Sequence, residues 1–275
     1  MTRVGVVTIA HGRRGHLDAQ HRSLALGRRR PDHYVVVAMD DPALDVATHR
    51  GLVRDVIHVP GVEQGLPLAA ARNRGVQHVL DAGADVVVLL DVDCLAGAGL
   101  VASYAEAVRQ APDRIWSGPV TYLGPDVFVS HPAELDGFDA PHRARPAPAV
   151  GEQVRSGDPN LFWSLSFATS PATWRRVGGF HEAYVGYGGE DTDFARQAGA
   201  ARVELWWLGG ARAYHQHHTV SSPPVEHLDA ILRNGRLFRE RWGEWPMAGW
   251  LSAFEELGLV RRDGDDWIAA SAAAV

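Results

Sequence analysis

The 275-residue sequence contains no lysine, because all 27 of its basic residues are arginine. The absence of lysine excludes any lysine-based chemistry. We attribute the bias toward arginine to a GC-rich coding sequence, and we expect a bacterial source. The 33 acidic residues outnumber the arginines and give a net charge of −6. A chain with this charge has no general attraction to nucleic acid or to anionic lipid. We therefore expect neither as a partner.

Cysteine and long apolar runs are also scarce. The single Cys94 excludes an internal disulfide framework and a metal site built from several cysteines. No apolar run approaches the ~18–20 residues that cross a bilayer. The apolar run Val4–Ala10 is followed at once by His11-Gly12-Arg13-Arg14, which is not the pattern of a signal peptide. With 46% hydrophobic and 22% charged residues, the composition is typical of a globular protein, and we expect a cytoplasmic location.

Short apolar runs alternate with helix-like segments through the first half of the chain. The predicted strands are 4–10, 34–39, 53–59 and 85–90, and the predicted helices are 16–26, 68–80 and 99–110. This alternation indicates βαβ units and a mostly parallel sheet. Ligands bind such sheets beyond the carboxyl ends of the strands. Three polar clusters, Thr8–Arg13, Asp40-Asp41 and Asp91–Asp93, are therefore expected at one crevice.

The second half has a different pattern. Residues 125–159 are rich in Pro, Asp, His and Arg and are too long for a passive connector, so they predict a mobile substrate loop. We then expect a strand at 161–167, a helix at 190–199, a strand at 203–208 and a helix at 225–242. The remaining residues are interpreted as a tail.

Asp91-Val92-Asp93 directly follows the strongest predicted strand. Two carboxylates at the end of a buried strand cost free energy unless something neutralises them, and a divalent cation does so. The cation then bridges to a phosphate, as Mg²⁺ and Mn²⁺ do with nucleotides. The alternative is a solvated strand end without chemistry. The position of the triplet opposite Asp40 favours the metal site.

His215-Gln216-His217-His218 follows the predicted strand 203–208. Imidazole binds borderline transition metals well and Mg²⁺ poorly, so a mixed carboxylate and imidazole set favours Mn²⁺ over Mg²⁺. The alternative is a group of partly exposed histidines with no ligand. Three histidines in four residues favour a metal role, although the spacing alone does not decide which of them bind.

Gly188-Gly189-Glu190-Asp191 places two carboxylates at the start of a predicted helix. A helix N-terminus keeps a carboxylate ionised, which suits a general base, although a simple helix cap is the alternative. The glycines allow a ligand to approach the backbone closely. Tyr187, Trp163 and Phe180 offer flat apolar faces for sugar rings or, alternatively, pack in the core. Arg13, Arg14 and Arg72 are candidate phosphate ligands near the crevice, or else solvated surface residues.

These segments together resemble a glycosyltransferase of the GT-A fold, in the family 2 superfamily, over roughly residues 4–245. The resemblance rests on four segments, which are Asp40, 68–75, Val88–Asp93 and the run from Val177 to Phe194. The Gly-Gly-Glu-Asp core is similar to the acceptor-side motif of β-1,4-galactosyltransferases. It implies an α/β GT-A catalytic domain at 1–245, with a Rossmann-like nucleotide-sugar half at 1–110, a smaller acceptor and metal half at 111–245, and a tail at 246–275.

The resemblance also implies residue roles. The sugar donor, a UDP-sugar in our prediction, would be bound by Thr8, Ala10, Arg13, Asp40, Arg72, Asp91, Val92 and Asp93. Mn²⁺, or Mg²⁺, would be ligated by Asp93, His215 and His218. Asp191 would be the catalytic base with Glu190 beside it, and the acceptor, a glycan or small molecule, would contact Trp163, Tyr187, Gly188 and Gly189. Tyr187 stands where galactosyltransferases have Trp.

These roles predict an inverting transfer from a nucleoside diphosphate sugar to an acceptor hydroxyl. A retaining hexosaminyltransferase of the same fold is the nearest alternative. A sugar-phosphate nucleotidyltransferase would need a Gly-rich phosphate loop with a catalytic Lys or Arg, which Ala10–Gly15 resembles only weakly. An oxidoreductase lacks its Gly-x-Gly-x-x-Gly motif after the first strand. A sugar-binding module without catalysis would not explain the carboxylates and histidines.

Overall fold

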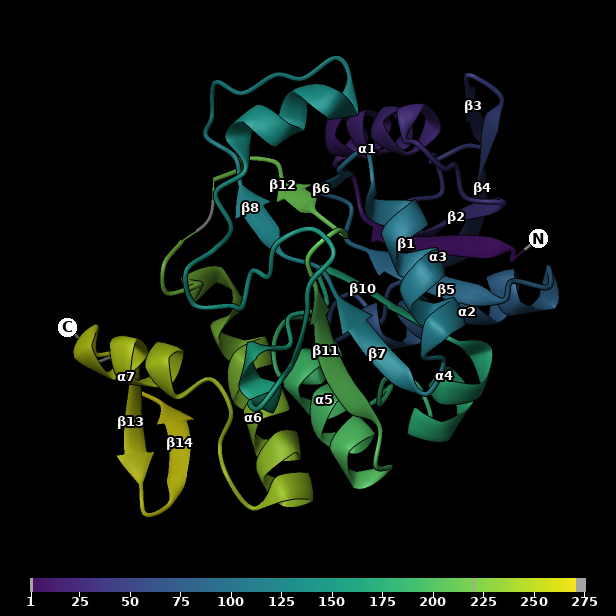
Figure 1. Ribbon diagram of the computed structural model, residues 1–275. Coiled ribbons are helices and arrows are strands. Elements are labelled where there is room, and N and C mark those ends of the chain that lie inside the picture. Colours follow the sequence, from purple (N-terminus) through teal and green to yellow (C-terminus); the bar gives the residue numbers. More distant parts are fainter. Residues whose placement is uncertain (1, 220, 271–275) are drawn as a thin grey trace.

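The computed structural model of the protein describes residues 2–219 and 221–270 (Figure 1). Within these residues, nine strands form a single mixed sheet at the centre of the fold. In spatial order they are β3 (Ala47–His49), β4 (Leu52–Val59), β2 (His33–Met39), β1 (Val4–Ala10), β5 (Val86–Leu90), β10 (Ser166–Thr169), β7 (Arg114–Ser117), β11 (Glu204–Leu208) and β9 (Gln153–Arg155).

Most strands of this sheet point the same way. Strands β4, β2, β1 and β5 are parallel neighbours, and β7 and β11 share their direction beyond the reversed strand β10. The edge strands β3 and β9 run antiparallel to their neighbours. The α/β fold with a mostly parallel central sheet, predicted from the alternation of strands and helices, is therefore confirmed.

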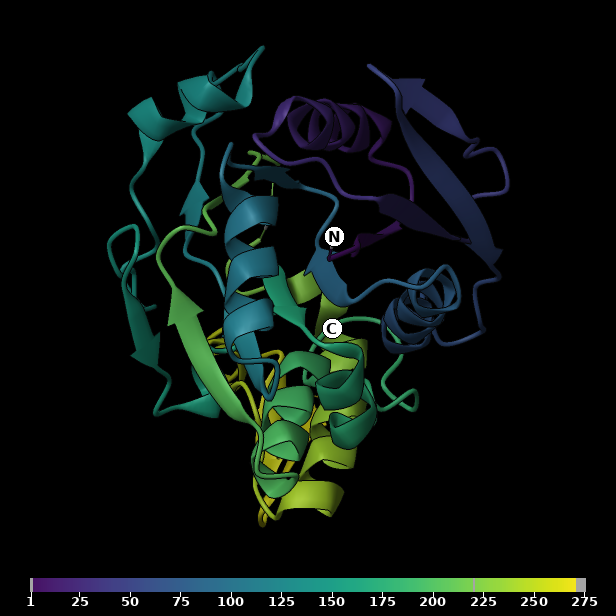
Figure 2. The same ribbon diagram turned by 45° about the vertical axis from the view of Figure 1, so that its right-hand side comes forward.

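Helices cover both faces of the sheet (Figure 2). In β1, Val6 belongs to one core with α1 (Arg14–Leu26) and α3 (Leu100–Gln110), whereas Val7 belongs to the opposite core. Side chains alternate between faces along a strand, so a strand covered on both sides has a continuous apolar sequence. The second core is completed by α2 (Leu68–Asp81), α4 (Pro171–Val177), α5 (Glu190–Ala200) and α6 (Leu228–Trp242).

A small three-stranded sheet joins two distant parts of the chain. It contains β6 (Cys94–Ala96), β12 (Ala213–His215) and β8 (Val120–Tyr122), with β12 in the middle. His215 pairs with Cys94, and the backbone N–H of Gln216 donates to the Asp93 carbonyl at 2.7 Å. This pairing brings the end of the histidine segment to the residues that follow β5.

Two predictions for the middle of the chain are wrong. The segment 125–159, expected as a mobile loop, contains a 3-10 helix at Pro132–Phe138 and the strand β9, which pairs with β11. The strand predicted at 161–167 is displaced, since a 3-10 helix occupies Pro159–Leu161 and β10 begins only at Ser166. Phe162 is fully buried against the rings of Phe167 and Phe194, so core packing explains the aromatic run.

The C-terminal segment is folded and was wrongly interpreted as a tail. After a 3-10 turn at Val225–His227 and α6, it forms α7 (Ala248–Glu256) and a hairpin of β13 (Val260–Asp263) and β14 (Asp266–Ala269). Figure 1 shows this C-terminal unit beside α6, apart from the central sheet. Its own core joins Leu251, Phe254 and Trp267 to α6. The last residues of the predicted tail, 271–275, lie outside the described part of the chain.

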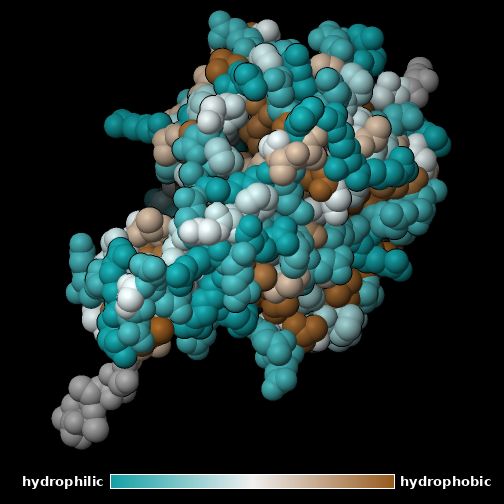
Figure 3. Space-filling model, turned by 90° about the horizontal axis from the view of Figure 1, so that it is seen from below, coloured by the Kyte–Doolittle hydropathy of each residue, from teal (hydrophilic) through white to brown (hydrophobic). Residues whose placement is uncertain are grey.

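The surface of the molecule is mainly polar where Figure 3 shows it. Hydrophobic residues on that face form separate groups among hydrophilic ones. Across the described residues, no helix has both the length and the apolar character needed to cross a membrane.

Candidate active site

Asp93, His215 and His218 form a cluster with metal-binding geometry. Their nearest ligand atoms lie within 4.8 Å of one another. His215 Nε2 is 3.5 Å from Asp93 Oδ1, and His218 Nε2 is 3.3 Å from Asp93 Oδ2. His217, between them in sequence, is exposed and does not belong to the cluster. The geometry therefore selects two of the three histidines that the sequence left open.

The cluster holds Asp93 in its ionised form. Burial alone would raise the pKa of this carboxyl, but hydrogen bonds from His215 and His218 and the charge of Arg13 lower it far below its usual range. The Arg13 guanidinium is 2.9 Å from Asp93 Oδ2. Metal binding requires a deprotonated carboxylate. One carboxylate with two imidazoles suits a borderline divalent cation such as Mn²⁺ better than Mg²⁺.

Arg72 connects the two acidic motifs. It extends from α2, is 4% exposed, and contacts Asp91 Oδ1 at 3.3 Å and Glu190 Oε1 at 3.4 Å. The Phe180 ring also lies under the guanidinium, with its centroid 5.2 Å from Arg72 Cζ. The Arg72 side chain therefore joins the strand-end motif Asp91–Asp93 to the Gly-Gly-Glu-Asp motif.

Asp191 is held at the N-terminal turn of α5. Its Oδ2 accepts a hydrogen bond from the Ser164 backbone N–H at 3.1 Å, and its Oδ1 accepts one from the Ser164 hydroxyl at 2.6 Å. A carboxylate has about four acceptor positions, so two bonds fix its orientation and leave others for a ligand. The helix N-terminus favours its negative charge.

The glycines before α5 adopt backbone conformations that other residues avoid. Gly188 and Gly189 have φ angles of 100° and 90°. The Gly188 N–H donates to Glu190 Oε2 at 3.1 Å, so the loop folds back on its own carboxylate. Asn234 of α6 donates to the carbonyl groups of Val185, Tyr187 and Gly188. Helix α6 therefore fixes the shape of the acceptor-side motif.

An arc of aromatic rings extends from the metal cluster toward Asp191. Tyr122 stacks on His215 with ring centroids 4.6 Å apart, His142 lies 5.5 Å from Tyr122, and Trp163 lies 5.1 Å from His142. Trp163 immediately precedes Ser164. Trp163 was predicted from the sequence, whereas Tyr122 and His142 were not. These two residues have no local sequence signal and reach the site through β8 and the loop after it.

The remaining predicted donor residues lie at or near the ends of β1, β2 and β5. Thr8 and Ala10 are buried in β1, so only their backbone can line a ligand pocket. Asp40 is exposed directly after β2, with a φ of 48°. Val92 is 9% exposed and belongs to the core rather than the ligand surface. The carboxyl ends of parallel strands thus meet where the sequence predicted.

Gln20 of α1 supports the Asp91–Cys94 turn and was missed. Its Oε1 accepts from Thr8 and Tyr34, and its Nε2 donates to the carbonyls of Asp91 and Cys94. The side chain is fully buried. The available signal was a glutamine on the same helix face as Leu17 and Leu24, since a polar group at a core position needs hydrogen-bond partners.

Glu190 should make stability depend on pH. Burial raises the pKa of Glu190, the charge of Asp191 raises it further, and Arg72 opposes the rise. A carboxyl with a raised folded-state pKa stabilises the fold while protonated, and this contribution is lost as pH rises through that value. We expect Glu190→Gln to be more stable than the wild type at pH 8, by on the order of 1 kcal/mol or more, with the difference shrinking toward pH 5.

The measurement is the thermal midpoint of the wild type and Glu190→Gln between pH 5 and pH 8. Glu256→Gln, on the exposed surface of α7, is the control and should show no such trend. A difference between Glu190→Gln and the wild type that stays constant across this range would contradict the expectation.

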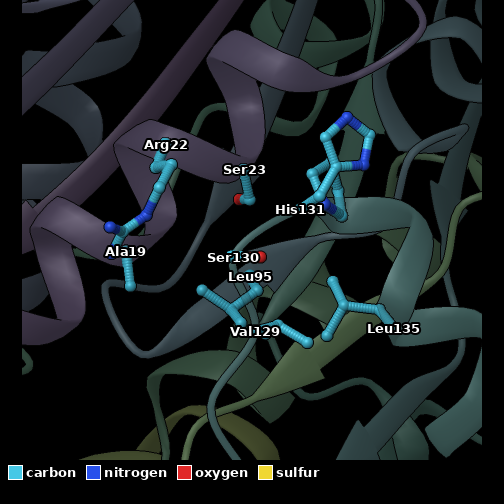
Figure 4. Close-up of a pocket in the computed structure, with 9 residues that line it drawn as sticks. Ala19, Arg22, Ser23, Leu95, Val129, Ser130, His131 and Leu135 are labelled. Atoms are coloured by element: carbon cyan, nitrogen blue, oxygen red, sulfur yellow. The ribbon is translucent and has the colours of Figure 1, made fainter.

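A separate pocket lies between α1 and the 3-10 helix 132–138, with Arg22, Ser23 and His131 around its rim (Figure 4). Its cavity volume is about 10 Å³. That is about the smallest space that holds one water molecule. It does not include the metal cluster or Asp191, and it is too small for a substrate.

The fold is that of the GT-A glycosyltransferases, and comparisons with solved structures support this assignment. GalNAc-T7, solved with UDP, GalNAc and Mn²⁺, aligns with a TM-score of 0.55 and 13% identity over 93% of this chain and 57% of that chain. S. aureus TarS aligns with a TM-score of 0.58 and 14% identity over 93% of this chain and 42% of that chain. At these identities the likeness shows the fold.

Sequence comparisons find similarity to glycosyltransferases as well. A family model described as the N-terminal domain of galactosyltransferase matches residues 158–219, which include the Gly-Gly-Glu-Asp motif and the histidine segment. Two validoxylamine A glucosyltransferases, from Streptomyces hygroscopicus subsp. limoneus and subsp. jinggangensis (strain 5008), are each 30% identical over 228 residues, or 74% of this chain. The chain spans about half the length of these relatives. The resemblance to GT-A fold glycosyltransferases is thus confirmed.

Proposed function

We propose that the protein is a metal-dependent glycosyltransferase that moves a sugar from a nucleoside diphosphate, UDP by preference, to an acceptor hydroxyl with inversion. The observation that carries this proposal is the convergence of Asp93, His215 and His218 from distant parts of the chain. Two comparisons support sugar transfer from a nucleoside diphosphate. The relatives are named glucosyltransferases, and one structural neighbour was solved with UDP and Mn²⁺.

The donor would lie across the carboxyl ends of β1, β2 and β5. Asp40 would contact the nucleoside, and Asp91 the ribose or the transferred sugar. Bound at Asp93, His215 and His218, Mn²⁺ would act as a Lewis acid that neutralises the departing diphosphate. Arg13, 2.9 Å from Asp93, lies close enough to this cluster to contact the same phosphates.

Asp191 would act as the general base. The acceptor oxygen would form a new bond to the anomeric carbon while its proton passes to Asp191. The bond between that carbon and the diphosphate oxygen would break, and its electron pair would leave with the nucleoside diphosphate. The two hydrogen bonds from Ser164 would hold the base in place for an attack from the face opposite the leaving group. This geometry inverts the anomeric configuration.

A thermal-shift screen tests donor binding directly. We expect UDP with Mn²⁺ to raise the melting temperature by several degrees, because a ligand that binds only the folded state stabilises it. UDP in EDTA should raise it much less. If no nucleoside diphosphate shifts the melting temperature with Mn²⁺, the proposal fails. NMR of the anomeric configuration of a transferred sugar then separates inversion from the retaining alternative.

A further inference from the structure

The C-terminal unit and the turn before α6 each contribute an aromatic ring beside the acceptor-side motif. Tyr187, the residue before Gly188, stacks on His227 with ring centroids 4.7 Å apart and 28° between the planes. Tyr187 also stacks on Trp250 of α7, at 5.6 Å and 26°. The group His227, Tyr187 and Trp250, which we call the aromatic platform, therefore combines three chain segments at the edge of the candidate site.

A close contact keeps α7 against this motif. A side-chain carbon added at Gly188 would lie only 2.8 Å from Met247 Sδ, so the glycine allows α7 to approach. A side-chain carbon added at Gly235 of α6 would lie 2.4 Å from the Trp245 ring, just before α7. These two glycines leave space for the Met247 and Trp245 side chains, so the chain that leads into α7, and with it Trp250, packs closely against the acceptor-side motif and α6.

The platform is more accessible than the core of the C-terminal unit. Tyr187 is 39% exposed, His227 is exposed and Trp250 is half-buried. Leu251 and Phe254, the neighbours of Trp250 on α7, are instead buried in the core of the unit. Trp250 packs against the edge of that core but is only half-buried, so part of its ring is available to a surface ligand.

The platform lies next to the acidic motif. Gly188 follows Tyr187 and its N–H donates to Glu190. Burial raises the pKa of the Tyr187 hydroxyl, and the charges of Glu190 and Asp191 raise it further. Saturated sugar rings present an apolar C–H face that packs on aromatic rings, while their hydroxyls donate to carboxylates. Few other neutral ligands need both groups together.

We propose that Trp250 and His227 extend the acceptor site with a carbohydrate-binding surface, so that the C-terminal unit selects the acceptor. This inference rests on the proposed function and adds residues to its acceptor side. A ring of the acceptor would pack on the platform while the hydroxyl to be glycosylated reaches Asp191. Donor binding at Asp93, His215 and His218 would not depend on the platform.

Saturation-transfer NMR on the full chain, with UDP and Mn²⁺ present, tests the proposal. The probes are glucose, galactose, N-acetylglucosamine, maltose and cellobiose. In the wild type, we expect a saturation-transfer signal for at least one of these sugars. The signal should fall fivefold or more in Trp250→Ala and should be retained in Trp250→Phe. Leu257→Ala, which removes a 57% exposed apolar side chain from the same unit, is the matched control and should behave as the wild type.

Calorimetry of UDP with Mn²⁺ on the same samples separates this inference from the proposed function. If the wild type does not bind UDP in the presence of Mn²⁺, the proposed function itself is contradicted. If UDP binds but no probe shows saturation transfer in the wild type, the inference is overturned. It is also overturned if Trp250→Ala keeps its melting temperature and retains the wild-type saturation transfer.

Discussion

Replacing Asp191 with asparagine is expected to reduce sugar transfer by about 10²–10⁴-fold, the usual contribution of a general base. Asparagine keeps the shape of the side chain and an oxygen that accepts from Ser164, but it cannot take the proton of the acceptor hydroxyl. The expected loss is in kcat. The dissociation constant for UDP with Mn²⁺ should stay within about threefold of the wild-type value, because the base is separate from the metal cluster.

The measurement is the initial rate of transfer, with UDP binding followed by calorimetry on the same variant. Asp229→Asn, at the exposed first turn of α6, changes an aspartate in a similar helix position and should keep full activity. An Asp191→Asn variant with full activity would remove Asp191 from the mechanism. A variant that also loses UDP binding would show a structural role instead.

Replacing His218 with alanine is expected to weaken Mn²⁺-dependent UDP binding by more than about 100-fold. Loss of a group outside the ligand shell already costs 10–100-fold in metal affinity, and His218 would be a direct ligand. The Nε2 atom of His218 lies 3.3 Å from Asp93 Oδ2, so alanine leaves the cluster with two ligands. Calorimetric titration of UDP at a fixed Mn²⁺ concentration measures the effect.

The neighbouring residue provides a matched control. His217 belongs to the same tetrapeptide but is exposed and lies outside the cluster, so His217→Ala should bind UDP as the wild type does. Equal losses in His217→Ala and His218→Ala would contradict the assigned ligand set. UDP binding that persists in His218→Ala and in EDTA would show that the donor site needs no metal.

The nucleotide half of the fold was predictable because its strands are buried on both faces. The runs Val4–Ala10 and Val86–Leu90 have apolar residues at every position or nearly so, which few structures other than a central parallel strand require. The acidic pairs at 91–93 and 190–191 were predictable because their charge conflicts with the apolar segments beside them. Such conflicts between local pattern and chemistry mark functional sites.

The remaining features depend on contacts between distant segments. The spacing of His215, His217 and His218 does not reveal which two bind metal, since the pairing of β12 with β6 decides which side chains reach Asp93. In the supposed tail, the sequence did contain a turn signal. Gly264-Asp265 forms the two-residue turn between β13 and β14, Gly264 has a φ of 59°, and Gly-Asp pairs are typical of two-residue hairpin turns.

Crystals grown with UDP and Mn²⁺ would test the central claim most directly, through the anomalous scattering of manganese. We predict a single strong peak within bonding distance of Asp93, His215 and His218, with the diphosphate completing the coordination and Asp191 facing the same cavity. A manganese peak elsewhere, or UDP bound in a region that shares no cavity with Asp191, would contradict the account.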